Sequence, residues 1–238
     1  SLHTVNGGAN VTTIGEYAFN DCYYLQSVNF PNVEHIAGYA FQNCSALKEI
    51  GGSTAINFIG AQAFYNTSNV FSDGITLSNV KIEQLAFWGS DVDEITLSGK
   101  IVIGDKAFAN SRLDSVNLQN ATALTLGNNV FENAWELTTI LLPDNMEAIP
   151  YGFAQGCSLL KTMNWPKSLK SIGAYAFSNA AFSELEVPDT VTVIGEGAYK
   201  DCIQLTSIKL PNTLERIGQD AFNGCRKLFT LTTPYLGE

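Results

Sequence analysis

Apolar residues recur along this chain with a long period, rather than with the short period of a single helix or strand. In each repeat an aliphatic residue is followed four to five residues later by Ala-Phe or a close variant, and then by a small residue. The aromatic position is occupied by Phe19, Phe41, Phe64, Phe87, Phe108, Phe131, Phe153, Phe177, Tyr199 and Phe222. Successive aromatics are 21 to 24 residues apart. A period in the twenties over the whole length predicts a solenoid of stacked coils.

The repeat Leu205–Cys225 shows how one coil is expected to fold. Residues 208–210 alternate apolar and polar, which predicts a half-buried strand, and Pro211 ends it because proline has no N–H for the ladder. Gly218 permits a turn, and Ala221 and Cys225, four residues apart, predict a short helical turn. The sequence therefore predicts an α/β solenoid in one domain, residues 1–238. It has about ten coils, one parallel sheet, and short helical turns on the opposite side.

Three repeats depart from this pattern. The third inserts two residues before Ile75, and the sixth has Val130 where the others have Ala. The seventh is interpreted as one residue shorter, between Ile149 and Phe153, so that Phe153 takes the aromatic position.

The order Leu-x-x-Ile-x-Leu-Pro, then Ile-Gly-x-x-Ala-Phe-x-x-Cys, resembles the leucine-rich repeat of the BspA-like type. That family occurs in surface proteins of many host-associated bacteria and some protists, and its members are associated with adhesion to host proteins and cells. The resemblance implies an extracellular or cell-surface location and a protein or glycoprotein partner, such as host extracellular matrix. It implies no enzyme activity and no cofactor, because the family shares no catalytic motif.

Composition narrows the possible partners. The net charge is −10, which argues against sequence-independent binding to nucleic acid or to an anionic membrane. The longest apolar stretches are too short to span a bilayer, so we expect no membrane insertion within this chain. The chain begins inside a repeat and ends just after one, at residues 233–234, which suggests a piece of a longer surface protein.

Residues that could hold a metal or form disulfides have simpler explanations. The five cysteines, Cys22, Cys44, Cys157, Cys202 and Cys225, share one position of the repeat, where other coils have Thr, Ser or Ala. We therefore expect free, structural thiols in a column that requires small buried side chains. His35 is expected to be solvated. The acidic run 91–94 could suggest a calcium loop, but Arg112 lies one coil along from Asp91 and could pair with it. The sequence predicts neither a catalytic site nor a metal site.

Two surfaces are candidates for partner binding. The exposed face of the predicted sheet carries small polar residues, such as Ser27 and Asn117, and is mildly acidic. Repeats three and four instead have aromatic residues where other repeats have polar or small ones: Phe58, Tyr65, Phe71 and Trp88. Exposed aromatics that break a repeat rule predict a contact patch. Two alternatives stay open: the insertion covers these rings and buries them, or the solenoid is a spacer. Glycan binding would need an exposed aromatic platform, for which Tyr65 and Trp88 are the candidate.

Overall fold

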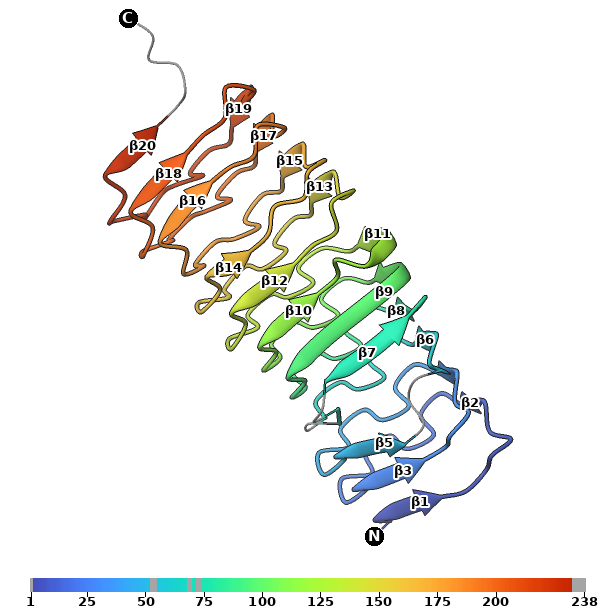
Figure 1. Ribbon diagram of the computed structural model, residues 1–238. Helices are drawn as coiled ribbons and strands as arrows, with labels where there is room; N and C mark the ends of the chain where they lie inside the picture. Colours follow the sequence, from blue (N-terminus) through green and yellow to red (C-terminus); the bar gives the residue numbers. More distant parts are fainter. Residues whose placement is uncertain (1, 52–54, 68–69, 72–73, 233–238) are drawn as a thin grey trace, which may run out of the picture.

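The computed structural model describes residues 2–51, 55–67, 70–71 and 74–232. It shows an elongated solenoid whose coils stack in sequence order from one end to the other (Figure 1). Each coil has three sides. A first face and a second face carry strands, and a turn face, which contains the Ala-Phe segment, returns the chain to the next coil.

The strands of each face run parallel and pair with those of the neighbouring coils. The first face contains β1 (Thr4–Asn6), β3 (Ser27–Asn29), β5 (Glu49–Gly51), β7 (Ile75–Ser78), the start of β9 (Glu94–Ile103), β10 (Ser115–Asn117), β12 (Thr139–Leu141), β14 (Thr162–Met163), β16 (Glu184–Glu186), β18 (Ser207–Lys209) and β20 (Thr230–Thr232). The second face contains β2 (Thr13–Ile14), β4 (His35–Ile36), β6 (Phe58–Ile59), β8 (Lys81–Ile82), the end of β9, β11 (Ala121–Leu126), β13 (Ala148–Ile149), β15 (Ser171–Ile172), β17 (Val193–Ile194) and β19 (Arg216–Ile217).

The expectation of one sheet is therefore too simple, because both faces carry strands. Among the described residues the strands form sheets of three, ten, four and three strands. The ten-stranded sheet includes both faces because β9 is long: it pairs with β7 and β10 on the first face and with β8 and β11 on the second.

The expectation of short helical turns is wrong, since the turn face contains no helix in the part of the chain that the structure describes. Within this segment alternate N–H groups bond three residues back, as Asn20 N–H does to the Tyr17 carbonyl (3.1 Å). The groups between them bond to the next coil, as Phe19 N–H does to the Ala40 carbonyl (2.8 Å). A helix would direct every N–H four residues back along its own chain. Here half of them extend the coil-to-coil ladder.

Left-handed backbone makes this turn geometry possible. The residue before the cysteine column has a positive φ in all ten coils. Its occupants are Asp21, Asn43, Asn66, Gly89, Asn110, Asn133, Gly156, Asn179, Asp201 and Gly224. Asn, Asp and Gly are the residues that adopt this conformation most readily. The sequence therefore contained a signal against a helix at every repeat.

The aromatic residues form a continuous stack along the core, as the repeat predicts. Rings from neighbouring coils lie with centroids 5.0–5.9 Å apart and nearly parallel planes in most of the column, for example Phe87 and Phe108 (5.0 Å, 4°). Every ring from Phe41 to Tyr199 is fully buried. The column interior is thus close-packed in the stacking direction.

The seventh coil differs from its sequence interpretation. Phe131 N–H bonds to the Phe153 carbonyl (2.9 Å), and Ala154 N–H bonds to the Ala176 carbonyl (2.8 Å). This register places Phe153 in the alanine column and Ala154 in the aromatic column, so Ala-Phe has become Phe-Ala and no residue is missing. Phe153 still fills the core, but it meets Phe131 and Phe177 edge-on, at 82° and 86°.

The cysteine column agrees with the sequence prediction. All five thiols are free, four are buried and Cys22 is half-buried. The Cys157 thiol contacts the Phe131 carbonyl at 3.0 Å, whereas Ser111 in the same column bonds the Phe108 carbonyl of its own coil at 2.7 Å. The column therefore accepts small side chains, and those with a thiol or a hydroxyl group contact a carbonyl.

Tyr199 is the one tyrosine in the aromatic column, and its hydroxyl is buried with no hydrogen-bond partner among the described residues. A buried donor without a partner costs about 1–3 kcal/mol. We expect Tyr199→Phe to raise the free energy of unfolding by about 1 kcal/mol in urea denaturation. Tyr175→Phe is the control, since that hydroxyl lies at the surface and donates to Glu196 (2.6 Å). A Tyr199→Phe variant less stable than wild type would contradict the prediction.

Candidate binding surface

The structure distributes the four predicted site residues over three parts of a coil. Tyr65 and Trp88 lie on the turn face, Phe58 lies on the second face in β6, and Phe71 lies in the core. They do not form one patch, and only Tyr65 and Trp88 contact each other directly as a ring pair.

Tyr65 and Trp88 stack at 4.6 Å between ring centroids with planes 9° apart. Each follows its core phenylalanine by one residue, which directs the side chain away from the core. Both rings are half-buried, which is less exposed than the sequence suggested. The reason is the stack itself, because each ring covers one face of the other.

Phe71 is a correction to the predicted site. Its side chain is 8% exposed and meets Phe64 and Phe87 edge-on, at 5.6 and 6.1 Å. The insertion in the third repeat therefore adds an aromatic residue to the core instead of placing one beside Tyr65. Residues 72–73 of this insertion lie outside the described part of the chain.

Phe58 belongs to a separate cluster on the second face. The imidazole of His35 stacks on its ring at 4.2 Å and 3°, and the Lys81 Nζ lies 5.5 Å from the ring centroid on the neighbouring coil. His35 is therefore a stacking partner and not simply a solvated side chain. With a neighbour on each side, Phe58 presents mainly its edge to solvent.

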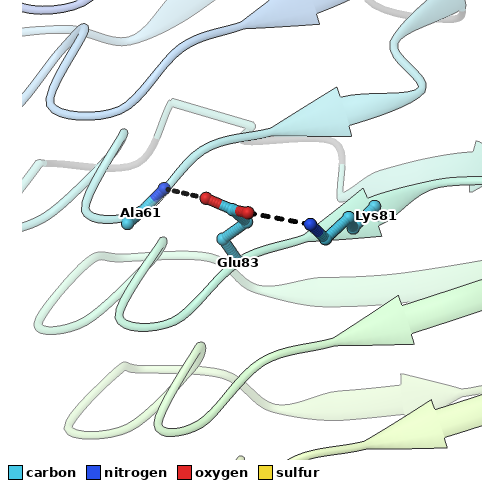
Figure 2. A network of polar contacts seen from close by, with 3 residues as sticks. All are labelled: Ala61, Lys81 and Glu83. Carbon is cyan, nitrogen blue, oxygen red and sulfur yellow. Dashed lines mark hydrogen bonds and ion pairs between the residues drawn. The ribbon is translucent and has the colours of Figure 1, made fainter.

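Figure 2 shows the contacts that Glu83 makes with Lys81 of this cluster and with Ala61. Most coils have glycine at the position of Glu83, because a side chain there points into the preceding coil. A Cβ on Gly60, for example, would lie 2.4 Å from the backbone nitrogen of Gly38. The Glu83 carboxylate accepts a hydrogen bond from Ala61 N–H (3.3 Å) and pairs with Lys81 (2.9 Å). The carboxylate thus bonds both to the backbone of the neighbouring coil and to Lys81, and these bonds hold the Lys81 ammonium group near the Phe58 ring.

The turn face of coils two to four adds residues that the sequence reasoning missed. The Gln62 amide nitrogen donates to the Tyr39 hydroxyl (3.2 Å), and the Gln42 amide nitrogen donates to the Gln62 amide oxygen (3.2 Å). We call Tyr39, Gln42, Gln62, Tyr65 and Trp88 the turn-face band. Tyr39 also stacks on Tyr17 of the first coil (4.8 Å, 7°).

The turn-face band is uncharged. Residues 39–43, 62–66 and 84–89 contain no Asp, Glu, Lys or Arg, although the chain carries a net charge of −10. Coils on either side do carry charges at the same positions, such as Glu16 and Asp21 in coil one and Asp105 and Lys106 in coil five. The signal for the band was thus present in the sequence, in the uncharged residues on both sides of the core aromatic in these three coils.

The other predicted features are exposed ion pairs. Arg112 bonds Glu136 (3.1 Å) and lies 4.0 Å from Asp91, in the coil-to-coil ladder that the sequence suggested. Such pairs contribute about 0–1 kcal/mol. Among the described residues, His, Cys, Asp and Glu form no group of three or more that could hold a metal ion. Within the same residues, no helix has the length and apolarity needed to cross a membrane.

Comparison with known proteins identifies the repeat. The BspA type leucine rich repeat region, six copies long, matches residues 12–138, 80–205 and 124–236. The chain belongs to this family. No curated protein matches the sequence of this BspA-type chain.

A solved structure shows the same fold. A leucine-rich repeat protein from Bacteroides ovatus is 29% identical, with a TM-score of 0.79 over 97% of this chain. The chain spans 63% of the length of that protein. A leucine rich repeat protein of T. pallidum (23% identity, 70% of this chain and 74% of the other, TM-score 0.49) also matches. So does a leucine rich cell surface protein from Faecalibacterium prausnitzii (20% identity, 99% and 88%, TM-score 0.40). The last two TM-scores are too low for a detailed comparison.

Proposed function

We propose that this chain is a non-enzymatic recognition solenoid, displayed outside the cell, which binds a protein or glycoprotein of the host through the turn-face band. The observation that carries the proposal is the uncharged aromatic and amide surface across coils two to four. Interface centres are enriched in Tyr and Trp and depleted in Lys, Glu and Asp, which is the composition of the band. The family and the name of the F. prausnitzii protein support a surface location.

The stacking geometry favours a protein partner over a sugar. A sugar ring packs on the open face of an aromatic ring. In the band, Tyr65 and Trp88 each have one face against the other, as do Tyr39 and Tyr17. Each ring thus keeps at most one open face, and the ring edges, the tyrosine hydroxyls and the amide groups make up the rest of a mixed surface that suits a folded protein.

The test is a double substitution, Tyr65→Ala/Trp88→Ala, in a binding assay against immobilised extracellular-matrix proteins. If the rings are binding hot spots, affinity should fall by at least ~2 kcal/mol, roughly thirtyfold. Stability should fall by about 0.5–1.5 kcal/mol for the lost ring pair, in addition to the apolar area that the two half-buried rings cover, and the variant stays folded because both rings lie outside the core.

The matched control is Tyr151→Ala/Tyr175→Ala, which removes an aromatic pair from the same turn face in coils seven and eight (centroids 5.9 Å apart). It should leave affinity unchanged. Equal loss of affinity in both double variants would show a general effect of destabilisation. Binding confined to a glycan array, with no matrix protein bound by wild type, would overturn the choice of a protein partner.

A further inference from the structure

The second face has a single interior break among the described strands, between β11 and β13 (Figure 1). In the other coils the N–H after the core aliphatic residue bonds to the aliphatic carbonyl of the preceding coil. Gly104 N–H, for example, bonds to the Ile82 carbonyl (2.8 Å), and Gly173 N–H bonds to the Ile149 carbonyl (2.9 Å). Coil seven has Pro150 at this position. Because proline has no N–H, the Leu126 carbonyl receives no bond from coil seven.

The second rung of the ladder is also missing at this junction. In coil five, Val102 N–H bonds to the Val80 carbonyl (3.1 Å). The equivalent groups two junctions further along, Ala148 N–H and the Leu124 carbonyl, are not bonded to each other. The break is not caused by an irregular β13, because β13 pairs normally with β15 on its other edge, where Ala148 lies opposite Ser171. The edge of β11 therefore has two backbone acceptors, on Leu124 and Leu126, without a strand partner.

A groove of about 460 Å³ lies at this break. Leu124 and Leu126 of β11 line one side, and Met146, Ala148 and Pro150 line the other. Leu126 occupies the column of core aliphatic residues that runs from Ile14 to Ile194. The other members of this column are at most 4% exposed, whereas Leu126 is half-buried. Leu124 is half-buried too. The groove thus combines an apolar lining with an unpaired strand edge.

We propose that this groove binds an extended peptide segment of a partner protein, which adds to β11 as a parallel strand. Two carbonyl acceptors on alternate residues need two N–H donors with the spacing of a strand, about 6.6 Å. An extended backbone supplies that spacing, and its side chains at alternate positions would cover Leu124 and Leu126. The one charged lining residue, Glu147, is already paired with Lys170 (3.1 Å). The site therefore selects apolar residues two positions apart and not a charged ligand.

This peptide site is independent of the proposed function. It lies on the second face of coils six and seven, whereas the turn-face band lies on another side of coils two to four. Loss of one site leaves the other intact, so Tyr65→Ala/Trp88→Ala should bind the peptide as wild type does.

The probe is a capped, fluorescein-labelled peptide, Gly-Lys-Ile-Val-Ile-Gly, which copies residues 99–104, the strand that pairs with β11 on its other edge. Its binding to the whole chain is measured by fluorescence anisotropy. We expect saturable binding that Leu126→Glu weakens at least tenfold. Pro150→Gly supplies the missing N–H, lets β13 pair with β11, and should also weaken binding at least tenfold.

Two controls separate strand addition from apolar adhesion. Pro188→Gly changes a proline far from the groove and should bind the peptide as wild type does. The same peptide with its central Ile-Val-Ile residues N-methylated keeps its side chains, loses those N–H donors, and should bind at least tenfold more weakly. No binding to wild type at millimolar peptide overturns the proposal. The proposal is also overturned if folded Leu126→Glu and Pro150→Gly bind the peptide as tightly as wild type does, or if the N-methylated peptide binds wild type as tightly as the unmethylated one.

Discussion

Phe108→Ala should lower the free energy of unfolding by about 3–5 kcal/mol, the range for truncating a fully buried phenylalanine. Phe108 is in the middle of the aromatic stack, between Phe87 (5.0 Å) and Phe131 (5.9 Å), and is 0% exposed. Both neighbours are held by their own coils and by backbone ladders, so the cavity left by the ring has little room to collapse. Urea denaturation followed by circular dichroism measures the loss.

Phe222→Ala is the matched control for this prediction. Phe222 occupies the same column in the last complete coil, where it is only partly buried and stacks on one ring, Tyr199 (5.6 Å). We expect a smaller loss, about 1–2 kcal/mol, because less of the ring leaves water on folding. If Phe108→Ala melted within a degree of wild type, the column assignment at that coil would be wrong.

The solenoid itself could be predicted because its signal is repeated in every coil. A single Ile or Phe predicts little, but a buried aliphatic residue and a buried aromatic residue at constant spacing require each coil to lie on the previous one. The same reasoning placed the cysteines correctly, since Cys157 shares its column with Ala134 and Ala180.

The turn geometry was predicted wrongly because two structures share one side-chain spacing. Ala221 and Cys225 fall on one side of a helical turn, and equally on one side of a pair of left-handed turns. Backbone conformation decides between them, and its signal is the Asn, Asp or Gly before each cysteine position, as at Asp201 and Gly224. Side-chain periodicity alone does not contain that information.

The candidate site was predicted in part, because a sequence does not show which way an extra residue turns. Phe71 and Phe153 both depart from the repeat, and both lie in the core, edge-on to neighbouring rings. A core needs its volume filled by apolar side chains, but it does not need each side chain to come from one fixed position of the repeat. An additional or displaced aromatic ring is therefore buried in the core wherever there is space for it. Tyr65 and Trp88 remain at the surface because the phenylalanines that precede them, Phe64 and Phe87, already fill the core.

The stability of the protein should fall steeply in alkali because of the buried thiols. Burial raises the pKa of Cys157 from the ordinary 9.0 to about 12. Below pH 9 the thiol is protonated in the folded and the unfolded chain, so it contributes no pH dependence. Between pH 9 and about 12 the unfolded chain loses the proton and the folded chain keeps it, so unfolding is favoured increasingly as the pH rises. The expected loss from this one residue is ~1.4 kcal/mol per pH unit, ~4 kcal/mol in total.

Cys157→Ala measures this contribution, since alanine occupies the same column in the coils on both sides. Urea denaturation at intervals from pH 8 to 11 should show the free energy of unfolding falling less steeply for the variant than for wild type. Ser111→Ala is the control, because it changes the same column without removing a titratable group, and its slope should match that of wild type. Burial also raises the pKa of Cys44 to about 12, so the variant should keep part of the alkaline loss. Parallel curves for Cys157→Ala and wild type would mean that Cys157 ionises in the folded protein, and that its column is open to solvent and to oxidants.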